Sequence, residues 1–78
     1  MPDLEQERAH LALADRHIAA GQKRVADQAC LVEHLTEQGY DTTKARDLLR
    51  LLEETLVNWR EHRQLILATI ARHTPSAP

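Results

Sequence analysis

The stretch QGYDTTKA, residues 38–45, interrupts a chain whose remaining sequence favours helix. Gly39 is expected just beyond the end of a first helix, because glycine adopts a positive φ at little steric cost. Asp41 or Thr42 can then cap the start of a second helix. The sequence therefore predicts an all-α chain of two helices joined at this turn. The expected elements are a helix over about 3–38, a turn at 39–41 and a helix over about 42–73.

Residues on both sides of this turn recur with the heptad spacing of a coiled coil. The stripe of the first helix is mostly apolar and comprises Leu4, Glu7, Leu11, Ala14, Ile18, Gly21, Val25, Gln28, Val32 and Leu35. The stripe of the second helix comprises Ala45, Leu49, Leu52, Leu56, Trp59, Arg63, Ile66 and Ile70. Two such stripes favour an antiparallel two-helix hairpin. We expect a single domain over 1–74, followed by a disordered tail at 75–78.

The position of the turn also predicts which residues face each other across the hairpin. With the turn centred near residue 40, facing residue numbers sum to about 80, so Gly21 would lie opposite Trp59. A glycine there would leave room for the indole of the single tryptophan; alternatively, Gly21 is a weak point or a bend in the helix. The expected hairpin core comprises Leu11, Ile18, Gly21, Val25, Val32, Leu49, Leu52, Leu56, Trp59 and Ile66.

Several leucines lie beside the two stripes, where a two-helix seam does not cover them. Leu48, Leu51 and Leu65 flank the stripe of the second helix, whereas Leu13 and Leu31 flank that of the first. Small domains with a thin core often gain stability by oligomerisation, so we expect a homodimer in which two hairpins form a four-helix bundle. Two alternatives remain open: the leucines are exposed on a monomer, or they bind another protein through the second helix.

The charge and hydropathy of the chain argue against nucleic acid or a membrane as its partner. It holds 10 basic and 12 acidic residues, a formal net charge of −2, without a basic stripe. Lys44, Arg46 and Arg50 support a nucleic-acid-binding regulator only as an alternative. The longest apolar run, LILATIA, is too short to span a bilayer. The N-terminal residues lack a secretory signal and the single cysteine excludes an intramolecular disulfide, so we expect a cytoplasmic protein.

The histidines raise the question of a metal site. Glu7 and His10 are spaced one helical turn apart, as in carboxylate-bridged di-iron bundles, and His73 is expected at the same level of the hairpin. The second helix supplies no glutamate there, so these three residues are weak candidates and a metal-binding bundle is a distant alternative. We therefore expect no metal and no cofactor.

Two further arrangements could carry chemistry or regulation. Cys30 lies one turn from His34, but a bare helix has no free backbone N–H groups to stabilise an oxyanion. We therefore expect no catalytic residue and no enzymatic activity. His17 and His62 are expected to lie near each other across the hairpin, either as a pH-sensitive polar pair or as two solvated side chains.

The segment GYDTTKARDLLRLLEETLVNWREHRQLI, residues 39–66, resembles a pattern in short bacterial helical-hairpin proteins without assigned activity. The residues that carry the resemblance are Gly39, Asp41, Thr42, Leu48, Leu49, Leu52, Glu53, Leu56, His62 and Arg63. The segment ADRHIAAGQKRVADQ, residues 14–28, is similar to the first helix of that pattern. The resemblance implies an architecture and no function. The sequence as a whole favours a non-enzymatic protein–protein interaction module, a small regulator or adaptor that acts through its helix surfaces.

Overall fold

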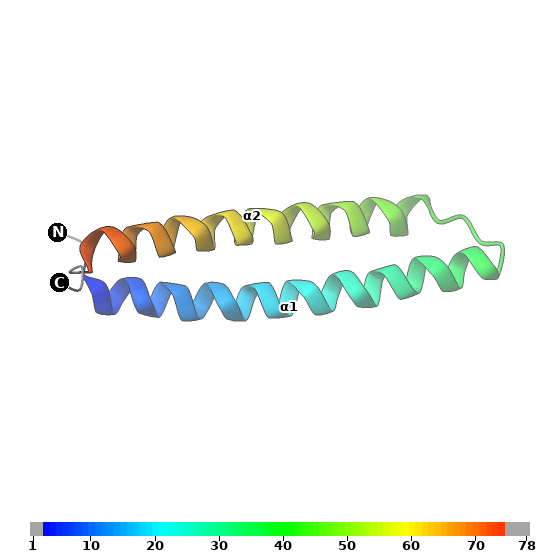
Figure 1. Ribbon diagram of the computed structural model, residues 1–78. Helices are drawn as coiled ribbons and strands as arrows, with labels where there is room; N and C mark the ends of the chain where they lie inside the picture. The colour runs from blue at the N-terminus through cyan, green and yellow to red at the C-terminus, as the bar shows by residue number, and fades with distance from the viewer. Residues whose placement is uncertain (1–2, 75–78) are drawn as a thin grey trace.

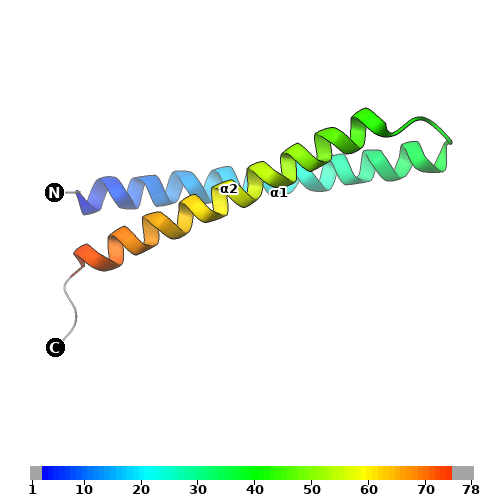
Figure 2. The same cartoon turned by 90° about the horizontal axis from the view of Figure 1, so that it is seen from above.

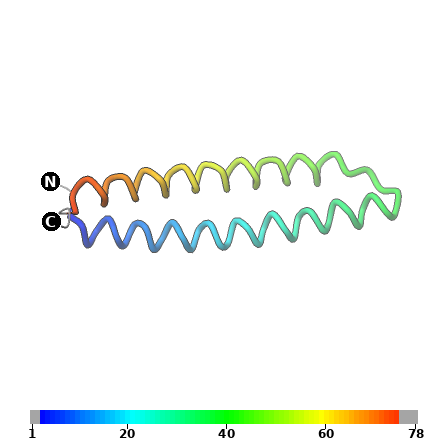
Figure 3. The backbone as a smooth tube through the Cα atoms, viewed as in Figure 1, coloured from blue at the N-terminus to red at the C-terminus, as the bar shows by residue number. Residues whose placement is uncertain are grey.

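The computed structural model describes residues 3–74, which form two long helices, α1 (Leu4–Glu37) and α2 (Thr43–His73). The helices run antiparallel, side by side, in a rod of 62 × 21 × 14 Å (Figures 1 and 3). The all-α helical hairpin expected from the sequence is confirmed. The helix ends lie within one residue of their expected positions, but the turn is longer and spans residues 38–42. The expected tail at 75–78 lies outside the described residues.

Glycine ends α1 in the way the sequence predicts. Gly39 has a φ of 76°, and its N–H donates to the carbonyl of Thr36 at 3.1 Å. The N–H of Tyr40 donates to the carbonyl of Leu35 at 2.9 Å. This pair of hydrogen bonds is a Schellman motif, which satisfies carbonyls that a helix end would otherwise leave without partners.

An aspartate organises the start of α2. Asp41 Oδ1 accepts the backbone N–H of Thr43 at 3.0 Å and the Thr43 hydroxyl at 2.7 Å. Thr42, which directly precedes the helix, makes no side-chain cap. Its hydroxyl oxygen instead accepts from Arg46 Nε at 2.8 Å. Of the two capping candidates, Asp41 therefore satisfies a free N–H of the first turn.

The Asp41 contacts predict acid sensitivity of this helix start. The Thr43 backbone N–H, and then its hydroxyl, hold the pKa of Asp41 below the ordinary value of 3.8. A lowered folded-state pKa stabilises the fold above the unfolded pKa, and this stabilisation is lost as pH falls through the folded value. Thermal unfolding of the wild type and Asp41→Ala should therefore differ most above roughly pH 5, and the difference should shrink below pH 3.8. An equal difference at every pH would contradict this assignment.

The chain between the helices doubles back along the last turn of α1, so α1 extends past the first residue of α2 (Figure 1). Contacts across the hairpin show the resulting offset. A Cβ built on Gly21 would lie 3.2 Å from Leu56 Cδ1, and Arg63 Nε lies 2.6 Å from Asp15 Oδ1. Facing residue numbers therefore sum to about 77, roughly one helical turn from the expected register. The predicted opposition of Gly21 and Trp59 is wrong, because the non-helical loop displaces α2 along α1.

The seam between the helices is narrow. Ala14, Leu56 and Ile66 are buried, with exposed fractions of 0%, 7% and 4%. All ten residues assigned to the hairpin core from the sequence are buried or half-buried. In the view from above, the helices cross at a shallow angle near their middles (Figure 2). Gly21 and Leu56 lie near the middles of α1 and α2, where the Leu56 side chain packs into the space that the glycine leaves open.

Candidate interaction surface

Aromatic contacts define one of the two broad faces of the hairpin. The His17 ring from α1 stacks on the Trp59 ring from α2, with centroids 4.2 Å apart and an interplanar angle of 13°. The rings of Trp59 and His62 form a T-shaped pair, with centroids 5.6 Å apart and an interplanar angle of 75°. His17 and His62 therefore lie on the same side of the seam, with Trp59 in contact with both. The register shift explains why the sequence-based pairing of the two histidines missed this tryptophan.

The exposed leucines lie on this same face. Leu31 follows His17 by two heptads and Leu48 precedes His62 by two heptads, so each returns to the same side of its helix. At 3.6 residues per turn, Leu13 lies about 40° around α1 from His17, and Leu51 and Leu65 lie about 20° and 60° around α2 from His62, so all three are on the same side of the seam. We call the surface formed by the five leucines with His17, Trp59 and His62 the leucine face. The sequence had singled out Leu48, Leu51 and Leu65 for association, and helical spacing places Leu13 and Leu31 of α1 on the same side of the seam.

The leucine face gathers most of the large apolar side chains that the described residues expose. Exposed fractions are 45% for Leu13 and Leu31, 46% for Leu48, 59% for Leu51 and 68% for Leu65. The other exposed members of this class are Tyr40 in the turn and Val57, which lies on the opposite side of α2 from His62. An open depression at the middle of the face is lined by Thr55, Asn58, Trp59 and His62. The surface is thus apolar toward both ends and polar in the middle.

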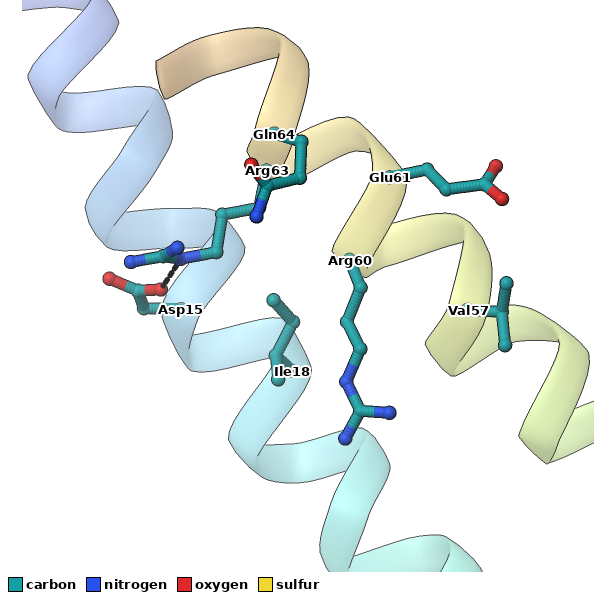
Figure 4. A pocket seen from close by; sticks show the side chains of 7 residues that line it. All are labelled: Asp15, Ile18, Val57, Arg60, Glu61, Arg63 and Gln64. Carbon is teal, nitrogen blue, oxygen red and sulfur yellow. Dashed lines mark hydrogen bonds and ion pairs between the residues drawn. The ribbon is translucent and has the colours of Figure 1, made fainter. Parts of the chain in front are cut away.

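The opposite face is charged, and we call it the charged face. One depression on it is lined by Asp15, Ile18, Val57, Arg60, Glu61, Arg63 and Gln64 (Figure 4). Arg63, the one charged residue in the α2 stripe, donates from Nε to Asp15 Oδ1 across the hairpin. Both side chains are partly exposed, 33% and 52%, so this pair contributes about 1 kcal/mol at most. The pair links α1 to α2, and it engages Arg63 Nε in a contact within the chain.

The basic residues considered for nucleic acid do not form one patch. Arg46 Nε is bound to the Thr42 hydroxyl, and Arg50 lies 3.9 Å from Asp47. Lys44 precedes Arg46 by two residues, which places it about 200° away around the helix. Their arrangement gives no specific support to the nucleic-acid alternative.

The weak metal candidates are also separated from further ligands. Glu7 and His10 approach to 3.8 Å, and His73 is the last residue of α2. Within residues 3–74, no group of three or more histidine, cysteine, aspartate or glutamate residues is placed to hold a metal ion. Cys30, the thiol considered beside His34, is exposed and is not part of a disulfide.

No protein family matches the chain, and no curated protein or solved structure matches it either. Neither of the two described helices is long and apolar enough to cross a membrane. The two broad faces of the hairpin differ, because the five exposed leucines lie on one face and the Arg63–Asp15 pair lies on the other.

Proposed function

We propose that this hairpin is a non-enzymatic protein–protein interaction module, a small regulator or adaptor that binds its partner through the leucine face. The observation that carries this proposal is the collection of five exposed leucines on one side of the seam. Exposed apolar side chains that gather on one face and are bordered by polar residues are typical of protein interaction sites. If the exposed leucines were scattered over the surface, some of them would also lie on the charged face.

The energetics favour a protein as the occupant of this face. Each leucine retains roughly half of its surface in water, and full burial of a leucine side chain contributes about 1.5–3 kcal/mol. Covering all five would therefore contribute on the order of 5 kcal/mol. The polar depression at Asn58 and His62 adds hydrogen-bonding groups to the middle of the same surface, which suits a helix carrying both apolar and polar side chains.

The helical architecture also supports a role without catalysis. Beyond the first turn of each helix, the backbone N–H groups of α1 and α2 are used in helical hydrogen bonds, so they are not free to stabilise a developing oxyanion. The single cysteine, Cys30, is an exposed thiol, which suits a reducing compartment. We accordingly place the module in the cytoplasm.

Site-specific photo-crosslinking in the native cells would test the proposal. A photoreactive amino acid at position 51 or 65, on the leucine face, should form adducts with protein. The matched control is position 57, which is 50% exposed and lines the depression of the charged face. Adducts from positions 51 and 65 that are absent from position 57 would support the proposal. Equal labelling from both faces, or labelling from position 57 alone, would refute it.

A further inference from the structure

We infer that the occupant of the leucine face is a second copy of this chain, so that two hairpins pack face to face as a four-helix bundle. This assignment rests on the proposed function and names the partner for the same surface. It is carried by three properties of the hairpin: the area left exposed, the second stripe on each helix, and the placement of the leucines along the rod.

The exposed area is too large for a closed domain of this mass. The chain exposes 6111 Å², whereas a folded monomer of 8.9 kDa exposes about 4,800 Å². The excess of about 1,300 Å² exceeds the roughly 800 Å² that each partner buries in a standard protein interface. Burying an area of this size against a second copy would bring the exposed surface of each chain close to that of a folded protein of the same mass.

The leucine face also supplies the second contact stripe that each helix of a four-helix bundle requires. Within one hairpin each helix touches a single neighbour, and only Ala14, Leu56 and Ile66 among the described residues become buried. In a bundle each helix packs against two neighbours around a shared core. Both helices carry exposed leucines on the leucine face, so both α1 and α2 can contribute side chains to such a core.

The leucines are placed so that this surface is complementary to itself. Measured from the Gly21–Leu56 layer, Leu13 and Leu65 lie toward the open end of the rod. Leu31 and Leu48 lie toward the turn, and all four are about eight to ten residues, or roughly 12–15 Å, from that layer. A two-fold symmetric interface requires the same patch on both copies. A two-fold axis along the rod or across its middle brings leucines of one copy onto leucines of the other in either case.

Solution mass, measured by light scattering over a range of micromolar concentrations, tests this inference. The wild-type chain should have twice the mass of 8.9 kDa. The double variant Leu51→Asp/Leu65→Asp should raise the dimer dissociation constant by about 100-fold or more, because two carboxylates would be buried per copy. The matched control Val57→Asp places the same charge at an exposed site on the other face and should remain dimeric.

Trp59 provides a second readout that does not depend on the aspartate variants. Trp59 is the chain's single tryptophan and lies in the central depression of the leucine face. Its emission should shift to longer wavelength as the wild type is diluted below the dimer dissociation constant. If the aspartate variant loses helicity, Leu51→Ala/Leu65→Ala should show the same shift at a higher concentration than the wild type.

The outcomes separate this inference from the proposed function. A wild-type monomer that nevertheless crosslinks to a different protein from positions 51 and 65 would overturn the second copy and leave the interaction module standing. A dimer equally unaffected by the leucine substitutions and by Val57→Asp would overturn this interface, because the two copies would then meet elsewhere. A dimer weakened only by the leucine substitutions supports the inference.

Discussion

Leu56→Ala is expected to lower the free energy of unfolding by about 2–4 kcal/mol. Leu56 is only 7% exposed and lies at the centre of the seam. Its Cδ1 packs where Gly21 has no side chain, 3.2 Å from the position a Cβ would take. Truncation would therefore leave a cavity that the facing glycine cannot fill, and the loss should include both the transfer term and the cavity term.

Val57→Ala is the control for this substitution. Val57 is the next residue in α2 but is 50% exposed, so its truncation should change stability by roughly 0.5 kcal/mol or less. Urea unfolding followed by helical circular dichroism would measure both variants. All samples should be held at one protein concentration, because any self-association adds to the apparent stability. Equal losses from the two variants would show that Leu56 is not in the seam.

The fold was predictable because its signals are local. The heptad spacing determines which side of each helix is apolar, and all ten members of the α1 stripe are buried or half-buried, including Glu7, Gly21 and Gln28. The turn residues were equally predictable, since Gly39 adopts the positive φ that ends α1 and Asp41 accepts an N–H at the start of α2. Neither inference requires knowledge of how the helices meet.

The register was not predictable because it depends on the path of the loop. A helical residue advances about 1.5 Å along the axis, whereas an extended residue advances about 3.3 Å. Residues 40–42 belong to neither helix, so their path sets where α2 begins along α1, and the contact of Leu56 with Gly21 places α2 roughly one helical turn from the register of a tight turn. That displacement brings Leu56 to Gly21 and leaves Trp59 beside His17.

The candidate surface was predictable in part. Leu48, Leu51 and Leu65 stood out because they exceed what one seam can cover, and that reasoning needs only the heptad positions. To assign Leu13 and Leu31 to the same surface, one must know which side of α1 lies next to which side of α2. The contacts of Trp59 with His17 and His62 supply that knowledge. These contacts depend on the register, which the sequence predicted incorrectly by about one helical turn.

Gly21→Leu is expected to lower the free energy of unfolding by about 1–3 kcal/mol through overpacking. A Cβ alone would already lie 3.2 Å from Leu56 Cδ1, and the remaining leucine carbons would press the helices apart at their crossing. This loss should appear although leucine favours helix over glycine by somewhat under ~1 kcal/mol. Ala19→Leu, at an exposed position of α1, is the control and should change stability by roughly 0.5 kcal/mol or less.

Combining Gly21→Leu with Leu56→Ala tests the contact itself. The pair exchanges the large and small partners of one layer and nearly conserves the volume of the seam, so the double variant should be more stable than the sum of the two losses predicts. A coupling energy of about 1–3 kcal/mol in a double-mutant cycle is expected for residues in direct contact. Additive losses would mean that Gly21 and Leu56 do not share a layer, and the register in which α2 is shifted by one turn along α1 would then be wrong.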